Sequence, residues 1–230
     1  MKRILVPFFL LLTISLNAQY QKGFGGAFTI GMQTIPVADL AVFAPDMVPL
    51  PTTSFTVGGY GYLQLGKLTV GAKGGGYFGA ESRDDDYVYK YGGGNFLIDV
   101  GYKLLATDRL TVYPVLGVGF YATEFNVAVL GAVDLAQVQK PDLNTSSFNI
   151  ANVLFDAGIR LEYLVSFRSS DVCGKGGAMI GIEAGYQYSP PTDYWKASCG
   201  CPVYNVPEYS FKGFYANIII GGFSGQKSSK

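Results

Sequence analysis

A strict two-residue alternation of apolar and polar side chains runs from Asn149 to Val165. Every odd-numbered position from Ala151 onward is apolar, whereas the even-numbered positions include Asn152, Asp156, Gly158, Arg160 and Glu162. This period is typical of a β-strand with one apolar and one polar face. Strands of soluble domains run about 5 to 6 residues, whereas a tilted strand needs about 9 to 11 to cross a bilayer. The segment therefore predicts a strand long enough to span a membrane.

Seven further segments show the same alternation, so we expect eight strands. They are Tyr20 to Gln33, Ser54 to Leu65, Leu68 to Ala80, Gly92 to Leu104, Leu110 to Ala122, Asn149 to Val165, Ala178 to Ser189 and Phe211 to Phe223. Pro114 lies inside the fifth, where a missing backbone N–H usually marks an edge or a bulge.

The predicted connections alternate in length. Short turns follow the second and fourth strands and a moderate one, Ser166 to Gly176, follows the sixth. The longer segments are Thr34 to Thr53, Glu81 to Tyr91, Thr123 to Phe148 and Pro190 to Ser210. An even number of strands with this alternation predicts an all-β fold, an eight-stranded antiparallel up-and-down transmembrane β-barrel with both termini on the short-turn, periplasmic side.

Seven charged residues lie well inside the predicted strands, and all seven fall on the face opposite the apolar stripe. They are Lys73, Asp99, Lys103, Asp156, Arg160, Glu162 and Glu183. Eight strands enclose a lumen that side chains just fill, so we expect these three cations and four anions to pair inside it. Tyrosines on the same face are expected to fill the remaining space: Tyr60, Tyr62, Tyr77, Tyr113, Tyr121 and Tyr215.

Aromatic residues gather near the two ends of the apolar face, as the girdles of membrane barrels do. The outer rim is expected to carry Phe55, Phe78, Phe96, Phe120, Tyr186, Tyr188 and Phe214, and the inner rim Tyr20, Tyr102 and Tyr163. The composition agrees, with 31 Gly, 17 Tyr, 16 Phe and only 15% charged residues.

The N-terminus has the pattern of a secretory signal peptide. Lys2 and Arg3 precede an apolar run that is too short for a spanning helix, and Asn17-Ala18 follows it. We expect cleavage after Ala18, a barrel over residues 19–223 and a periplasmic tail over residues 224–230. The mature chain is then close to neutral, which argues against a nucleic-acid partner.

The long segments are where a partner would bind. Thr34 to Thr53 and Thr123 to Phe148 are apolar, so they are expected either to pack over the barrel mouth or to contact a surface or envelope protein. Within the latter, Val127 to Val138 suits a short amphipathic helix or a strand extension. Arg83 to Asp86 lacks the ligand spacing of a calcium loop, and no metal or cofactor is predicted.

Three cysteines lie late in the chain, an odd number for an exported protein. The predicted barrel separates Cys173, in a periplasmic turn, from Cys199 and Cys201, in an outer loop. A bridge from Cys173 to either is therefore excluded, which leaves a tight Cys199–Cys201 bridge, free thiols or an intermolecular link.

On these strands, and on the signal-peptide end Leu16-Asn17-Ala18-Gln19, the chain resembles the small eight-stranded outer-membrane barrels of the OmpA and OmpX kind, and more specifically the β-barrel outer-membrane proteins of Bacteroidota. The resemblance covers residues 19–223 and implies a Gram-negative outer-membrane protein surrounded by lipid. Members often end on an aromatic residue, whereas here Ser224 to Lys230 follow Phe223.

The resulting hypothesis is a non-catalytic barrel that serves as a structural envelope protein or a surface-loop binding module, with a salt-bridged lumen. The alternatives are a narrow porin-like channel, and a soluble lipocalin-like carrier in which the apolar face points inward. An enzyme is the third. The chain contains no His, the commonest general base and metal ligand, although carboxylate chemistry from Asp99, Asp156 or Glu183 stays open.

Overall fold

The structure is a computed structural model, and it describes residues 22–36, 51–83, 85, 87–107, 109–129, 145–170, 174–204, 206 and 208–226. The predicted signal peptide and residues 227–230 of the predicted tail lie outside these ranges. Within them, no helix is long and apolar enough to cross a membrane.

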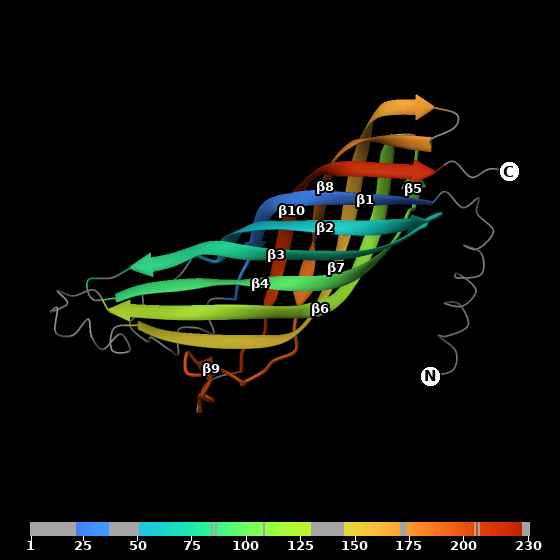
Figure 1. The fold of residues 1–230 in the computed structure, drawn as a ribbon. Helices are drawn as coiled ribbons and strands as arrows, with labels where there is room; N and C mark the ends of the chain where they lie inside the picture. The colour runs from blue at the N-terminus through green and yellow to red at the C-terminus, as the bar shows by residue number, and fades with distance from the viewer. Residues whose placement is uncertain are drawn as a thin grey trace, which may run out of the picture.

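Eight long strands form one closed antiparallel barrel (Figure 1). They are β1 (Lys22–Thr34), β2 (Thr53–Leu65), β3 (Leu68–Arg83), β4 (Tyr87–Tyr102), β6 (Leu110–Val129), β7 (Thr145–Ser170), β8 (Gly174–Tyr188) and β10 (Lys212–Gln226). Sequential neighbours pair around the wall, and β1 pairs with β10 to close it. Two short strands, β5 (Leu105–Ala106) and β9 (Lys196–Ala197), add to β6 and β7 at opposite ends. The predicted eight-stranded fold is confirmed.

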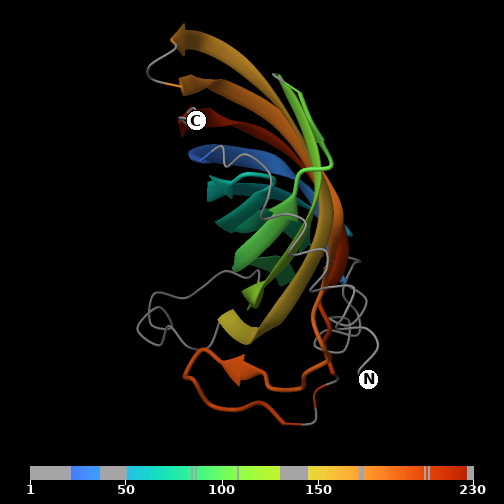
Figure 2. The same cartoon turned by 90° about the vertical axis from the view of Figure 1, so that its right-hand side faces the viewer.

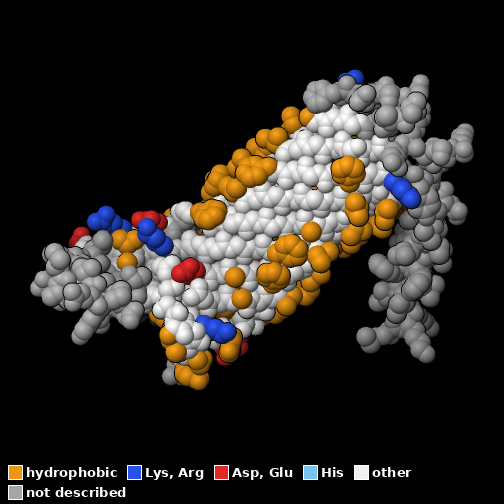
Figure 3. Space-filling model, viewed as in Figure 1, with side chains coloured by type: hydrophobic (Ala, Val, Ile, Leu, Met, Phe, Trp, Pro, Cys, Tyr) orange, Lys and Arg blue, Asp and Glu red, His pale blue; other side chains and the backbone are white. Residues whose placement is uncertain are grey.

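Side-chain parity places the apolar stripe outside and the polar stripe inside. Mid-strand residues on the outer face are well exposed, among them Phe28 at 51%, Leu116 at 66% and Ile159 at 61%. Figure 3 shows apolar side chains along the middle of the barrel, with charged ones toward its two ends. A closed sheet leaves no unpaired edge, so its backbone groups can lie in hydrocarbon. This is the arrangement of an outer-membrane β-barrel, and it rules out the inverted, soluble carrier.

The predicted aromatic girdle lies on this outer face. At the long-loop end, Phe96 packs on Phe120 with ring centroids 5.7 Å apart, and Tyr186 packs on Phe214 at 4.9 Å. Tyr163 is 41% exposed near the opposite end. Tyr20 lies outside the described residues.

The adjacent strands β3, β4, β6 and β7 extend past the others at the long-loop end, so the wall is taller on one side (Figure 1). The prediction that Glu81 to Tyr91 forms a loop is wrong, because Glu81–Arg83 pairs with Val88–Lys90 as a strand extension. Likewise Thr123–Val129 and Thr145–Phe148 belong to β6 and β7. The strand alternative thus holds for the first three residues of Val127 to Val138, and residues 130–144 lie outside the described part.

A β-bulge explains why the apolar–polar alternation of the sequence does not extend to the end of β3. The register shifts between Tyr77 and Ala80, where Gly79 adopts a positive φ of 94° that glycine tolerates. An extra residue reverses the side-chain parity beyond it. A strict two-residue reading therefore stops at this point although the strand continues.

Pro114 lies inside β6, paired with Ile159 of β7 on one side and with no residue of β4 on the other. The β4–β6 ladder ends at the pair Gly101–Val115, and the short β5 resumes pairing only at Val112. On this side Pro114 occupies the gap between them, so no residue of β4 or β5 is paired with it and the missing N–H interrupts neither ladder. At the far end of the chain, β10 runs to Gln226, beyond the predicted end at Phe223.

Candidate functional site

The lumen is filled by two layers of different chemistry. A cluster of ionised side chains lies in the middle of the barrel, and a cluster of aromatic side chains lies toward the long-loop end. All six inward tyrosines named from the sequence are buried. Together these layers are the candidate functional site.

Five of the seven predicted charges form one continuous ion-pair cluster. Lys73 Nζ lies 2.7 Å from Asp156 Oδ2 and 2.6 Å from Glu183 Oε1. Arg160 Nη2 lies 2.8 Å from Glu183 Oε2 and 3.1 Å from Asp99 Oδ2. Glu183 therefore joins the two cations, and the cluster ties β3 and β4 to β7 and β8 across the lumen.

Cross-strand register brings these groups together. Arg160 is directly opposite Glu183 on the adjoining strand, and inward glycines flank the acids on their neighbouring strands. A Cβ at Gly71 would lie 2.7 Å from Asp99 Oδ1, and one at Gly158 would lie 2.7 Å from the Tyr215 hydroxyl. Only glycine leaves the space that these side chains occupy.

Tyrosines complete the coordination of the cluster. The Tyr215 hydroxyl donates to Glu183 Oε1 at 2.8 Å, and the Lys73 ammonium lies 4.9 Å from the centroid of the Tyr215 ring. The Arg160 guanidinium stacks over the Tyr60 ring at 4.2 Å. These hydroxyl hydrogen bonds and cation–π contacts stabilise the buried charges in addition to the ion pairs.

The other two predicted charges remain outside the ion pairs. Glu162 Oε1 accepts hydrogen bonds from the hydroxyls of Tyr60 and Tyr113, the latter at 2.7 Å. Lys103 Nζ donates to Gln64 Oε1 at 2.7 Å, and no carboxylate of the described chain lies within ion-pair distance of it. Among the described residues, five of the seven charges are therefore ion-paired, whereas Glu162 and Lys103 are not.

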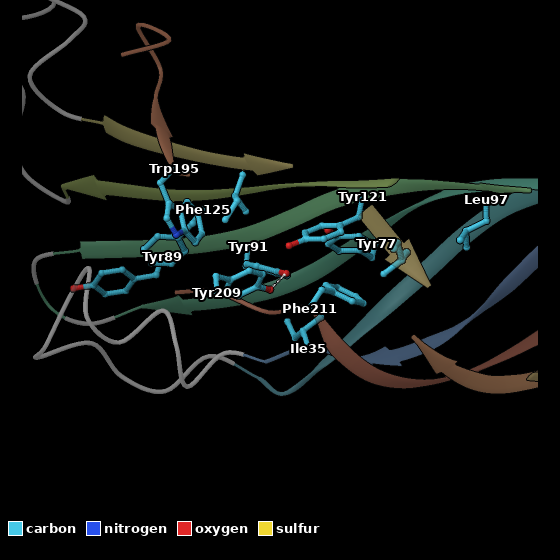
Figure 4. Close-up of a cluster of buried hydrophobic side chains, with 12 residues drawn as sticks. Ile35, Tyr77, Tyr89, Tyr91, Leu97, Tyr121, Phe125, Trp195, Tyr209 and Phe211 are labelled. Atoms are coloured by element: carbon cyan, nitrogen blue, oxygen red, sulfur yellow. Dashed lines mark hydrogen bonds between the residues drawn. The ribbon is translucent and has the colours of Figure 1, made fainter. Parts of the chain in front are cut away.

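The aromatic cluster closes the lumen at the long-loop end, and we call it the aromatic cap (Figure 4). Its members are Ile35, Tyr77, Tyr89, Tyr91, Leu97, Tyr121, Phe125, Ile150, Leu154, Trp195, Tyr209 and Phe211. The hydroxyls of Tyr91 and Tyr209 lie 2.6 Å apart, and Trp195 meets the Tyr209 ring edge-on at 5.5 Å. Side chains from the wall and from the loop after β8 thus form a single apolar layer.

The loop after β8, residues 189–211, contributes side chains to the lumen, which the sequence did not predict. It lies beside the long-loop end of β7 (Figure 2). There it adds β9 to β7, and Lys196 and Ala197 pair with Asn149 and Phe148. The sequence signal was the aromatic content of the segment, which holds the chain's single tryptophan. Aromatic side chains bury a large apolar area, so a connecting segment rich in them is expected to pack some of them against the rest of the protein.

The tip of the same loop carries the two paired cysteines. Cys199 and Cys201 form a disulfide with their Cα atoms 5.4 Å apart, beside Gly200 at a positive φ of 77°. This selects the bridge among the predicted alternatives for these two cysteines. Cys173, Asp84 and Asp86 lie outside the described residues.

Little open space remains between the two layers. A cavity of about 50 Å³ lies beside Lys73, Tyr77 and Gln187, enough for one or two water molecules. Nowhere in the described ranges do three or more His, Cys, Asp or Glu side chains gather as metal ligands would.

Comparisons with known proteins found similarity to solved structures. No family model matches the sequence, and no curated protein matches it. Among solved structures, the chain is similar to the attachment invasion locus protein Ail of Yersinia pestis, with 9% identity and a TM-score of 0.42 over 90% of this chain and 99% of that one. For Neisserial surface protein A the identity is 11% and the TM-score 0.39, over 89% of this chain and 96% of that one. For the outer membrane protease OmpT of Escherichia coli the identity is 6% and the TM-score 0.34, over 91% of this chain and 98% of that one.

These three structures carry different names for what they do, and one fold hosts many functions. The barrel assignment here rests on the closed sheet, the apolar belt and the polar lumen of the chain itself. The chain is an outer-membrane β-barrel, and its place among the Bacteroidota proteins stays a prediction.

Proposed function

We propose that the protein is a non-catalytic outer-membrane barrel whose filled lumen holds a surface-binding loop, residues 189–211, in a fixed position. The observation that carries the proposal is the division of this loop between two environments. Trp195 and Tyr209 are 1% and 0% exposed within the aromatic cap, whereas Tyr194 and Tyr204 are 59% and 78% exposed.

Buried anchors and exposed tyrosines on one loop suit a binding surface. Ordering a loop beforehand removes part of the entropy cost of binding, and exposed tyrosines are enriched in recognition surfaces because they offer large, rigid, amphipathic contacts. Lys196 adds a cation 5.2 Å from the Tyr194 ring. The loop is therefore prepared for a partner outside the cell.

The structural role is supported by the ion-pair cluster, which links opposite walls, and the cap, which links the wall to the loop. Neither layer presents an ionised group to the outside solution as a catalytic site would. The partner contacts predicted through residues 34–53 and 123–148 remain a prediction, because residues 37–50 and 130–144 lie outside the described part.

Site-specific photo-crosslinking in intact cells tests the proposal. A benzophenone amino acid replaces Tyr204, and in a matched control it replaces Tyr186, whose ring faces lipid. We expect a discrete crosslinked species from position 204 and none of the same mass from position 186. The same crosslinked species at both positions, or no crosslinked species at position 204, would contradict a binding role.

A further inference from the structure

The short-turn end of the lumen holds a cavity that neither the ion-pair cluster nor the aromatic cap occupies. We call it the vestibule; its volume is about 490 Å³. Short turns are periplasmic in barrels of this kind, so the vestibule opens toward the periplasm. The residues that matter here are Tyr62, Gln64, Lys103, Arg109, Glu162 and Met179.

Lys103 is the unusual member of the lining. It is 7% exposed, and within the described part of the chain its ammonium donates to the neutral amide oxygen of Gln64, at 2.7 Å, and to no carboxylate. Lys73 and Arg160, the other lumen cations, each contact two carboxylates. A buried charge without an opposite charge is costly. Burial lowers the pKa of Lys103, which follows the last residue of β4, and Glu162 offsets this only in part.

The ammonium is nevertheless held firmly in the cavity. The backbone N–H of Lys103 donates to Lys67 O at 2.8 Å, which fixes the start of its side chain. The amide nitrogen of Gln64 donates to Gly66 O at 3.1 Å, so its oxygen is turned toward Lys103. The Phe223 ring lies 5.8 Å from the ammonium. This support is typical of a positioned binding group.

The charges around the cavity are polarised along its length. Arg109 lines the vestibule from the exposed turn before β6, at the mouth. Glu162 lies at the inner end, where two tyrosine hydroxyls hold one of its oxygens. An anion that enters would be attracted by the two cations and stopped by the carboxylate below. The walls between them include the apolar side chains of Met179 and Leu164.

We propose that the vestibule binds a small organic carboxylate from the periplasm, with the Lys103 ammonium as its main partner and Arg109 as a second. The ligand's carboxylate supplies the opposite charge that Lys103 lacks, and its apolar body lies against Met179. This site is separate from the outer loop and does not depend on the function proposed for that loop.

Methionine-methyl NMR offers a direct test on the full chain folded in lipid nanodiscs. The sequence contains four Met; Met179 lines the vestibule, whereas Met32 faces lipid and is 59% exposed. Benzoate is titrated as the probe, with benzamide as its uncharged counterpart and inorganic phosphate as the competing anion. We expect a saturable shift of the Met179 methyl with benzoate alone, and no shift of Met32.

Substitutions then identify the binding group. Lys103→Gln should weaken benzoate binding about tenfold or more, as loss of a charged hydrogen bond does, and Arg109→Gln by a smaller factor. Lys67→Gln, which removes an exposed lysine of the neighbouring turn, should change it less than twofold. If Lys103→Gln fails to fold, by the heat-dependent shift in gel mobility, the exposed Arg109→Gln carries the comparison.

Three results would overturn the proposal. The first is that benzamide binds with the same affinity as benzoate. The second is that the Lys103→Gln variant binds benzoate with the same affinity as the unchanged protein. The third is that phosphate saturates the Met179 shift and benzoate does not.

Discussion

At the scale of single residues, the charge pairing of the lumen converges on Arg160 and Glu183. Arg160 is 1% exposed and contacts both Asp99 and Glu183, and Glu183 in turn contacts Lys73. Ion pairs this deeply buried gain little net stability over apolar side chains, but breaking one leaves a buried charge unopposed. The cluster should therefore tolerate loss of a matched pair better than loss of one partner.

We predict that Arg160→Met lowers the free energy of unfolding by about 3 to 5 kcal/mol, because Asp99 then keeps a buried negative charge without its cation. Arg160→Met with Asp99→Asn should recover part of that loss. Urea unfolding in lipid vesicles, followed by the fluorescence of Trp195, measures both. Lys67→Met, in an exposed turn, is the control. A loss below about 1 kcal/mol for the single variant would show that the cluster is solvated.

At the scale of elements, the loop after β8 behaves as a part of the barrel interior. Ser189 Oγ accepts from the backbone N–H of Phe211 at 3.1 Å, and Ser210 Oγ donates to Ser189 O at 2.6 Å, so the two ends of the loop are joined. Asn152 Nδ2 donates to Pro190 O at 2.8 Å and ties the loop to β7. The loop therefore stays ordered through its ends, its short strand and its buried aromatic residues.

Trp195→Ala should destabilise the outer end of the barrel by about 3 to 5 kcal/mol, the usual cost of removing a buried aromatic side chain. Tyr204→Ala, on the exposed side of the same loop, should change stability by less than about 0.5 kcal/mol. Hydrogen exchange of the β9 and β7 amides measures the local effect. Equal protection in the two variants would mean that the cap does not hold the loop.

At the scale of the whole molecule, two closures lie in series along the lumen. The ion-pair cluster fills the middle of the barrel and the aromatic cap covers the long-loop end, with a cavity of about 50 Å³ between them. An eight-stranded barrel has little interior space beyond its own side chains. A hydrated ion that enters the vestibule therefore meets both layers before it can cross.

We predict no steady single-channel conductance for the unchanged protein in planar bilayers. Tyr209→Ala, which opens the cap alone, should not conduct either, because the ion-pair cluster still fills the lumen. A sixteen-stranded porin recorded in the same bilayers is the positive control. Steady conductance steps from the unchanged protein would contradict the filled lumen and favour the narrow channel.

The sequence by itself determined the strands, the closed barrel and the inward direction of the seven charges. It could do so because alternation is a local property: successive side chains of a strand point to opposite faces whatever the rest of the chain does. It failed near Gly79, where one extra residue reverses that alternation.

Only the tertiary structure decided which charges meet. Lys73 and Glu183 are 110 positions apart, and their contact depends on how the strands are staggered when the barrel closes. The same stagger places the Lys103 ammonium beside the amide oxygen of Gln64 instead of a carboxylate, and it places Trp195 in the aromatic cap. Local periodicity carries no information about stagger, so pairing, the aromatic cap and the vestibule became visible only in three dimensions.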